Sequence, residues 1–183
     1  MSQIITHSTP TEQWQQLVHC AEESCHQDLD EDLESYLVFL LMRQTGNTEL
    51  ADSILASQYL QGMQSEGQNC IQQLQEVGDQ CLIYSGLFPK RSRRRLVKVS
   101  YYVDLGRSSY IHIAGKMKQG YATLYEHLSE YFVVLMDVLQ AMRSLNSEDT
   151  DNNLLLELSL DCNSERAANI LAENNIITFP RRK

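Results

Sequence analysis

The sequence contains few prolines, which interrupt helices and strands, and few cysteines, which can cross-link a chain. Its 183 residues include only three prolines and five cysteines. The cysteines are odd in number and no two form a C-x-x-C pair, so neither a disulfide scaffold nor a zinc knuckle is predicted. Unpaired thiols fit a reducing compartment, and we therefore expect a cytoplasmic protein.

Long apolar segments are also missing. The longest uninterrupted apolar run spans residues 36–42, whereas a membrane-spanning helix needs about 20 apolar residues. Residues 1–11 contain no Lys or Arg and no apolar zone of the kind that a secretory signal requires. We expect neither a membrane span nor a secretory leader.

Catalytic spacings are absent as well. The sequence contains no G-x-S-x-G, no G-x-x-x-x-G-K-[ST] and no G-x-G-x-x-G, which are the patterns of hydrolase nucleophiles, phosphate loops and dinucleotide sites. No cofactor is expected, and the sequence gives no positive support for an enzyme.

One pattern keeps a metal- or cofactor-dependent enzyme open as an alternative. Glu23 and His26 form an E-x-x-H spacing, which in di-iron bundles supplies half of a metal site. Glu126, His127 and Glu130 offer further ligands on another predicted helix, but they do not repeat that spacing. Because a metal site needs a complete ligand set, this alternative ranks second.

The composition is that of a globular protein, with 43% hydrophobic and 21% charged residues. Apolar residues recur at intervals of three and four, and no segment reads convincingly as a strand. We predict an all-α fold, a single-domain bundle of about six to eight helices over residues 1–183. Residues 1–9 and 178–183 are expected to be loose ends.

Local signals place the helices. Thr9, Pro10 and Glu12 form a capping box that starts the first one, and Gly106 lies in a seam where a facing helix can come close. The body 33–43 is apolar on nearly all sides, which indicates a central helix. The predicted helices are 10–26, 33–43, one carrying Leu50 to Tyr59, 68–88, 96–117, one long helix over 121–142, and two short ones near 153–161 and 164–174.

What the sequence does have is a concentrated basic block in an acidic chain. Six of the fifteen basic residues fall within positions 90–98, which leaves nine basic residues against 24 acidic ones elsewhere. The block consists of Lys90, Arg91, Arg93, Arg94, Arg95 and Lys98. Such asymmetry predicts a surface where something acidic docks.

We define the residues from Gly86 to Lys98 as the basic corner and predict a partner-binding site there. Leu87 and Phe88 offer an apolar anchor beside the arginines, and Tyr102 an aromatic ring. A non-enzymatic interaction or adaptor protein that binds an acidic protein partner is the leading hypothesis. Two alternatives stay open: the block neutralises the chain's own acidic loops, or it contacts nucleic acid. The sequence does not indicate an oligomeric state.

Four stretches, residues 34–43, 77–89, 100–110 and 135–143, together resemble an uncharacterised bacterial protein family. The resemblance covers residues 34–143 and leaves both ends unmatched. It implies a bacterial cytosolic protein and no catalytic activity.

Overall fold

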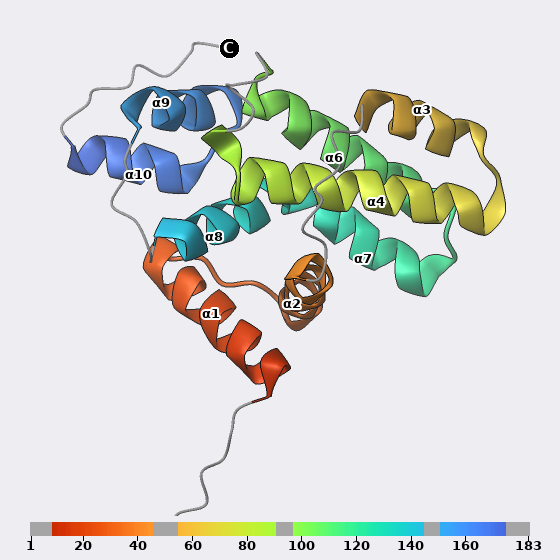
Figure 1. Cartoon of the computed structure of the whole chain (residues 1–183), viewed down its shortest axis with the longest axis horizontal. Coiled ribbons are helices and arrows are strands. Elements are labelled where there is room, and N and C mark those ends of the chain that lie inside the picture. Colours follow the sequence, from red (N-terminus) through yellow and green to blue (C-terminus); the bar gives the residue numbers. More distant parts are fainter. Residues whose placement is uncertain (1–8, 46–54, 91–96, 145–150, 175–183) are drawn as a thin grey trace, which may run out of the picture.

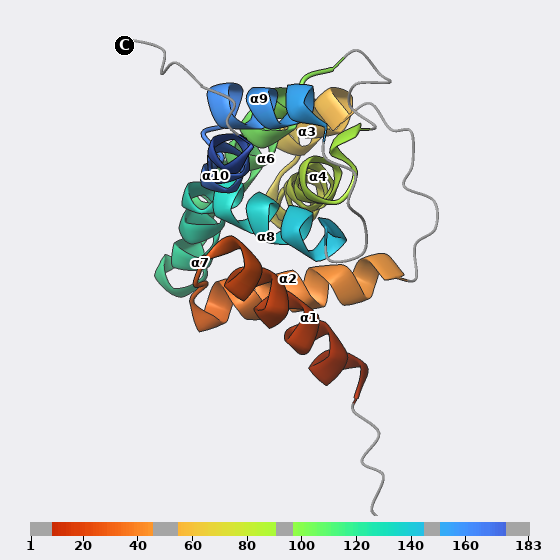
Figure 2. The ribbon, with the colours of Figure 1, turned by 90° about the vertical axis from the view of Figure 1, so that its left-hand side faces the viewer.

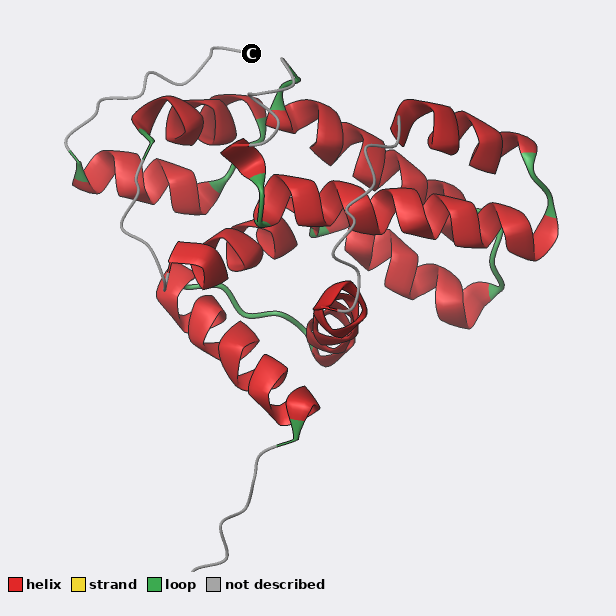
Figure 3. Cartoon of the chain, in the orientation of Figure 1, coloured by secondary structure: helices red, strands yellow, loops and turns green. Residues whose placement is uncertain are grey.

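The computed structural model describes residues 9–45, 55–90, 97–144 and 151–174. Within these ranges the chain forms nine helices and no strand (Figure 3). They are α1 (Pro10–Cys25), α2 (Glu31–Thr45), α3 (Leu55–Gln64), α4 (Gly67–Gly86), α6 (Val99–Ala114), α7 (Gln119–Glu130), α8 (Phe132–Ser144), α9 (Asn152–Asp161) and α10 (Glu165–Glu173). The all-α prediction is confirmed, although the helix count exceeds the six to eight expected. None of these helices has the length and apolar character required to cross a bilayer.

Helix α4 packs against α3 and against α6, which lies behind it in Figure 1, and α6 packs in turn against α7. Helix α8 packs against α4 on one side and α1 on the other, and α9 and α10 form a hairpin beside α8 and α6. Helices α1 and α2 pack against each other on the side of the molecule opposite α9 (Figure 2). This arrangement brings the ends of α1, α8 and α10 to one place.

Several helix boundaries follow from the local signals in the sequence. Thr9 accepts a hydrogen bond from the Glu12 N–H, and the Glu12 carboxylate accepts one from the Thr9 N–H, which confirms the capping box at the start of α1. Ser164 caps α10 by accepting from the Ala167 N–H at 3.0 Å. The predicted loose ends lie, apart from Thr9, outside the described residues, as do Leu50 and Ile54 of the third predicted helix.

The long helix predicted over 121–142 is wrong, because the chain turns at Tyr131. This residue leaves the helical conformation with φ −89° and ψ 13° and separates α7 from α8. Its side chain is exposed, whereas Phe132 is fully buried. The turn lets α7 pack on α6 while α8 passes between α4 and α1.

The predicted central helix is also corrected. Phe39 on α2 is 58% exposed, so one apolar side of α2 faces outward. Helix α8 is the central one, since nine of its 13 residues are buried. Five of these have no exposed surface: Phe132, Leu135, Met136, Val138 and Leu139.

Two glycines set how closely α4, α6 and α8 approach. A Cβ placed on Gly106 of α6 would lie 2.4 Å from Cε2 of Phe132, and one on Gly78 of α4 would lie 2.6 Å from Cε1 of Tyr110. Both distances are too short for any real side-chain carbon. The predicted close approach at Gly106 is therefore confirmed, and Tyr110 reaches deep against α4 for the same reason.

Candidate functional site

The basic corner begins where α4 ends. Leu87 is half-buried against the core and Pro89 is buried, whereas Phe88 between them is 41% exposed. Lys90 follows as a half-buried residue. The four arginines Arg91, Arg93, Arg94 and Arg95 lie outside the described residues. The described part of the corner thus presents one aromatic side chain at the start of the basic block.

The corner ends at Lys98, immediately before α6. Its side chain is exposed, and Nζ lies 2.8 Å from Oδ2 of Asp161 in α9. At this residue the block therefore pairs with an acid of the same chain, at the end of α9. A solvent-exposed pair of this kind contributes only about 0–1 kcal/mol, so a partner's carboxylate can compete for it.

Tyr102 does not lie on the surface. It is 5% exposed and its ring packs against Tyr84, with 5.6 Å between the ring centroids. Its neighbour Tyr101 is 40% exposed. Because residues adjacent in a helix point about 100° apart, the exposed ring beside the corner is Tyr101, which corrects the placement of Tyr102 in the partner site.

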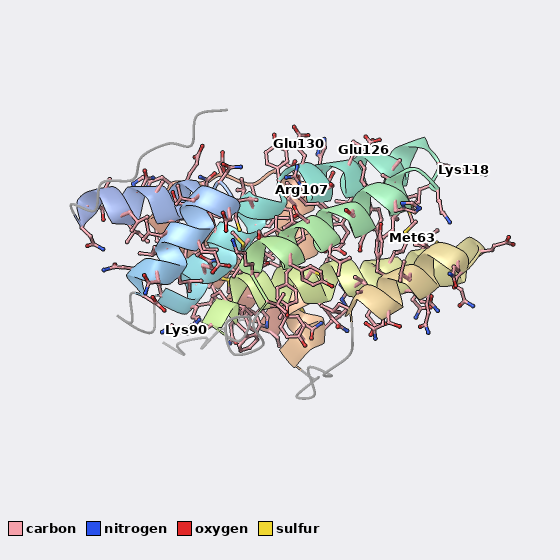
Figure 4. All side chains as sticks on the ribbon, turned by 90° about the horizontal axis from the view of Figure 1, so that it is seen from above. Met63, Lys90, Arg107, Lys118, Glu126 and Glu130 are labelled. Carbon is pink, nitrogen blue, oxygen red and sulfur yellow. The ribbon has the colours of Figure 1, made fainter. Side chains whose placement is uncertain are left out.

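The alternative metal ligands are not brought together. Glu23 and His26 lie at the C-terminal end of α1, whereas Glu126 and Glu130 lie on α7 (Figure 4). His127 instead pairs with Asp30, with 3.4 Å between Nδ1 and Oδ2. Across the described residues no three His, Cys, Asp or Glu side chains form a group that could hold a metal ion.

A polar cluster that the sequence analysis did not assign lies in the core around Asp79 of α4. Oδ1 accepts hydrogen bonds from the hydroxyls of Tyr36 (2.6 Å) and Tyr110 (2.8 Å), and Oδ2 accepts one from the guanidinium of Arg43 (2.8 Å). Gln75 donates to the Tyr36 oxygen at 3.3 Å. Burial raises the pKa of Asp79, while these three donors act in the opposite direction. The carboxylate thus joins α2, α4 and α6.

Asp137 of α8 is a second buried carboxylate. Its Oδ1 accepts from the Ser164 hydroxyl at 2.6 Å, and its Oδ2 accepts from the Arg166 backbone N–H at 3.4 Å. Burial raises the pKa of Asp137 to about 6, although both hydrogen bonds and the Arg166 charge oppose this shift. Asp137 therefore holds the first turn of α10 against α8.

Next to this contact is a cavity of about 500 Å³ between α1, α8 and α10. Its polar wall includes the guanidinium of Arg166, which donates to the Ser144 hydroxyl at 2.7 Å. The thiol of Cys25 belongs to the lining, and burial raises its pKa. The full lining is Ser24, Cys25, His26, Ala141, Ser144, Arg166, Asn169, Ile170, Ala172 and Glu173.

The sequence carried a signal for both carboxylates. Asp79 and Asp137 stand among apolar residues at helical spacing, and a buried acid requires hydrogen-bond donors. The partners could not be found in the same way, because they come from helices distant in the sequence. The cavity left no local signal, since its lining is drawn from three separate segments.

The described residues thus form an all-helical protein with three notable features. These are the basic corner, the buried polar cluster around Asp79, and the cavity between α1, α8 and α10. No family model, curated protein or solved structure matches the chain. The resemblance to a bacterial family stays a prediction.

Proposed function

We propose that this protein is a non-enzymatic interaction or adaptor protein that binds an acidic partner protein through the basic corner. The observation that carries the proposal is the concentration of basic charge directly after Phe88, a large aromatic side chain left exposed at the end of α4. Aromatic and arginine side chains are the residues most enriched at protein interfaces and at their energetic hot spots.

The surroundings of Phe88 favour a docking role. Leu87 and Pro89, which flank it, are at least half-buried, so the backbone on both sides is anchored. Tyr101 at the start of α6 is a second exposed ring close in sequence to the basic block. An aromatic residue presented from an anchored backbone loses little conformational freedom on binding.

The charge of the corner decides which partner it suits. The net charge of the whole chain is −9, so the molecule repels most polyanions. A local basic segment then favours a partner whose acidic side chains lie against that segment. Nucleic acid is the competing occupant. It would give binding that weakens steeply with salt, because each neutralised phosphate releases counterions.

We also propose a cellular location and a domain organisation for this protein. All five cysteines are free thiols, which fits a cytoplasmic protein, and the resemblance noted above suggests a bacterial cell. In the same proposal, residues 1–183 form one domain.

The test is a quantitative pull-down from an extract of the source cells, with and without nuclease. The bait is the native chain, the double variant Arg93→Glu/Arg94→Glu, or the matched control Arg107→Glu/Lys118→Glu. Arg107 and Lys118 are exposed, and both lie far from Lys90 in Figure 4. Both variants change the net charge equally, so only the position differs.

We expect a protein partner that the native chain and the control retain, that nuclease treatment does not release, and that the corner variant loses. Phe88→Ala should weaken the same partner. Identical recovery by all three baits, with equal thermal midpoints, would show that the partner does not bind through these arginines and would overturn the proposal. Loss on nuclease treatment would identify nucleic acid as the occupant.

A further inference from the structure

The cavity between α1, α8 and α10 has the dimensions of a ligand site. Its volume of about 500 Å³ lies within the range of small-molecule pockets. The cavity is open to solvent, and its walls combine polar side chains with the apolar surface of Ala141 and Ile170. In Figure 1 the three helices that form it converge at one side of the molecule, far from α3. The basic corner supplies none of its lining residues.

Arg166 supplies the permanent positive charge of this site, whose lining also holds His26 and Glu173. Among the described residues its guanidinium has a single hydrogen-bond partner, the Ser144 hydroxyl. An arginine side chain carries five N–H donors in a planar fork, so most of them remain for a ligand. The Ser144 hydroxyl also donates to the Gln140 carbonyl at 3.0 Å, which fixes its lone pairs toward Arg166.

The backbone of Arg166 is held in place by the buried carboxylate of Asp137. Its backbone N–H donates to Asp137, and Ser164, two residues earlier, donates to the same carboxylate. The first turn of α10 is therefore attached to the central helix α8. A guanidinium held on a rigid element binds a ligand with less loss of conformational freedom.

The remaining lining limits what the ligand can be. Ala141, Ile170 and Ala172 provide apolar surface. Glu173 stands seven residues after Arg166 on α10, about 10.5 Å farther along the helix axis. A second negative group on the ligand would meet this acid. The walls thus suit a single anionic head with an apolar body.

We propose that this cavity binds a small organic monocarboxylate, with its carboxylate on the Arg166 fork and its apolar body against Ile170 and Ala172. Planar carboxylates match the guanidinium fork through two parallel hydrogen bonds. The site is independent of the proposed partner surface, so either proposal can fail alone.

The experiment uses the full chain and three probes: hexanoate, its uncharged analogue hexanamide, and inorganic phosphate. Binding is measured by titration while the backbone amide resonances of the protein are followed by NMR. We expect hexanoate to shift resonances of α10 and of the α1 C-terminus, with hexanamide and phosphate at least about tenfold weaker.

Two variants test the geometry. Arg166→Gln should weaken hexanoate at least about tenfold, whereas Arg107→Gln, which removes an exposed arginine of α6, should leave the affinity unchanged. Ala172→Trp fills the cavity without removing the guanidinium and should also abolish binding. Because Arg166→Gln could perturb α10, Ala172→Trp supplies a test that does not depend on that residue.

The proposal is overturned if hexanoate produces no shifts up to about 10 mM, a concentration at which even a ligand with a Kd of about 1 mM is mostly bound. It is equally overturned if hexanamide or phosphate binds as well as hexanoate. Binding that survives Ala172→Trp would place the carboxylate elsewhere on the molecule and also overturn it.

Discussion

Asp79 and Asp137 are both buried acids within apolar helices, but the two receive their hydrogen bonds from different kinds of donor. Asp79 is bonded by long side chains of other helices, namely two tyrosines and one arginine. Asp137 is bonded by a serine hydroxyl and a backbone N–H from the first turn of α10. One carboxylate thus holds three core helices together, and the other fixes the start of a single peripheral helix.

This difference has an energetic consequence. The charge of Asp79 is compensated by the Arg43 guanidinium at 2.8 Å, whereas Asp137 has no cation in direct contact among the described residues. Burial raises the pKa of both carboxyls, that of Asp137 to about 6. We therefore expect removal of the Asp79 carboxylate to lower the free energy of unfolding most. The contribution of Asp137, which joins α8 to α10, should depend on pH.

The largest effect is expected for Asp79→Ala. This change leaves the buried Tyr110 hydroxyl and the half-buried Tyr36 hydroxyl without their acceptor. Each unsatisfied group costs about 1–3 kcal/mol, so the two together cost about 3–5 kcal/mol, while Arg43, 53% exposed, can turn to solvent. We expect the free energy of unfolding, measured by denaturant titration, to fall by that amount. Asp104→Ala, at an exposed position of α6, should change it by less than about 0.5 kcal/mol. Equal effects of the two variants would refute a central role for Asp79.

The next largest effect is expected for the Asp137 carboxyl, whose contribution to the free energy of unfolding depends on pH. Its folded-state pKa of about 6 lies above the ordinary value of 3.8, so the folded protein binds more protons between these values. This carboxyl therefore stabilises the fold most at low pH, and its contribution is lost as the pH rises through about 6. At about 1.4 kcal/mol per pKa unit, the change amounts to about 3 kcal/mol.

The measurement compares the free energy of unfolding of the native chain and Asp137→Asn from about pH 4 to about pH 7. The amide stays neutral, so the native chain should lose stability relative to the variant across this interval. Asp79 and Glu22, whose pKa values burial also raises, are present in both proteins and cancel in the comparison. Parallel pH profiles would contradict the assignment.

Part of this fold was predictable because some signals are local. The start of α1 at Thr9 and the cap of α10 at Ser164 depend on residues within one turn, and both were predicted correctly. The turn at Tyr131 was missed because the helical periodicity continues across it. Phe132, the first residue of α8, packs against Gly106 of α6, and such a contact between distant segments leaves no trace in the periodicity.

The candidate sites likewise depend on contacts between segments that are distant in the sequence. The apolar composition of α2 did not reveal that Phe39 faces outward, because composition does not tell which side of a helix is covered. The basic block is visible in the sequence, but the burial of Tyr102 and the Lys98–Asp161 pair depend on where α4 and α9 lie. The partners of Asp79 and Asp137 likewise become visible only when the helices are assembled.

The smallest effect should come from Ser164→Ala, and it links the two roles of that residue. Ser164 caps α10 and donates to Asp137, so its loss should cost about 1–2 kcal/mol. Thr9→Ala removes an exposed cap of α1 that has no buried carboxylate as a partner, and should cost about 1 kcal/mol or less. Because a hydroxyl bonds an ionised carboxylate more strongly than a neutral one, the cost of Ser164→Ala should be larger at pH values above about 6 than below. A cost equal to that of Thr9→Ala at every pH would mean that the serine only caps the helix and that Asp137 does not depend on it.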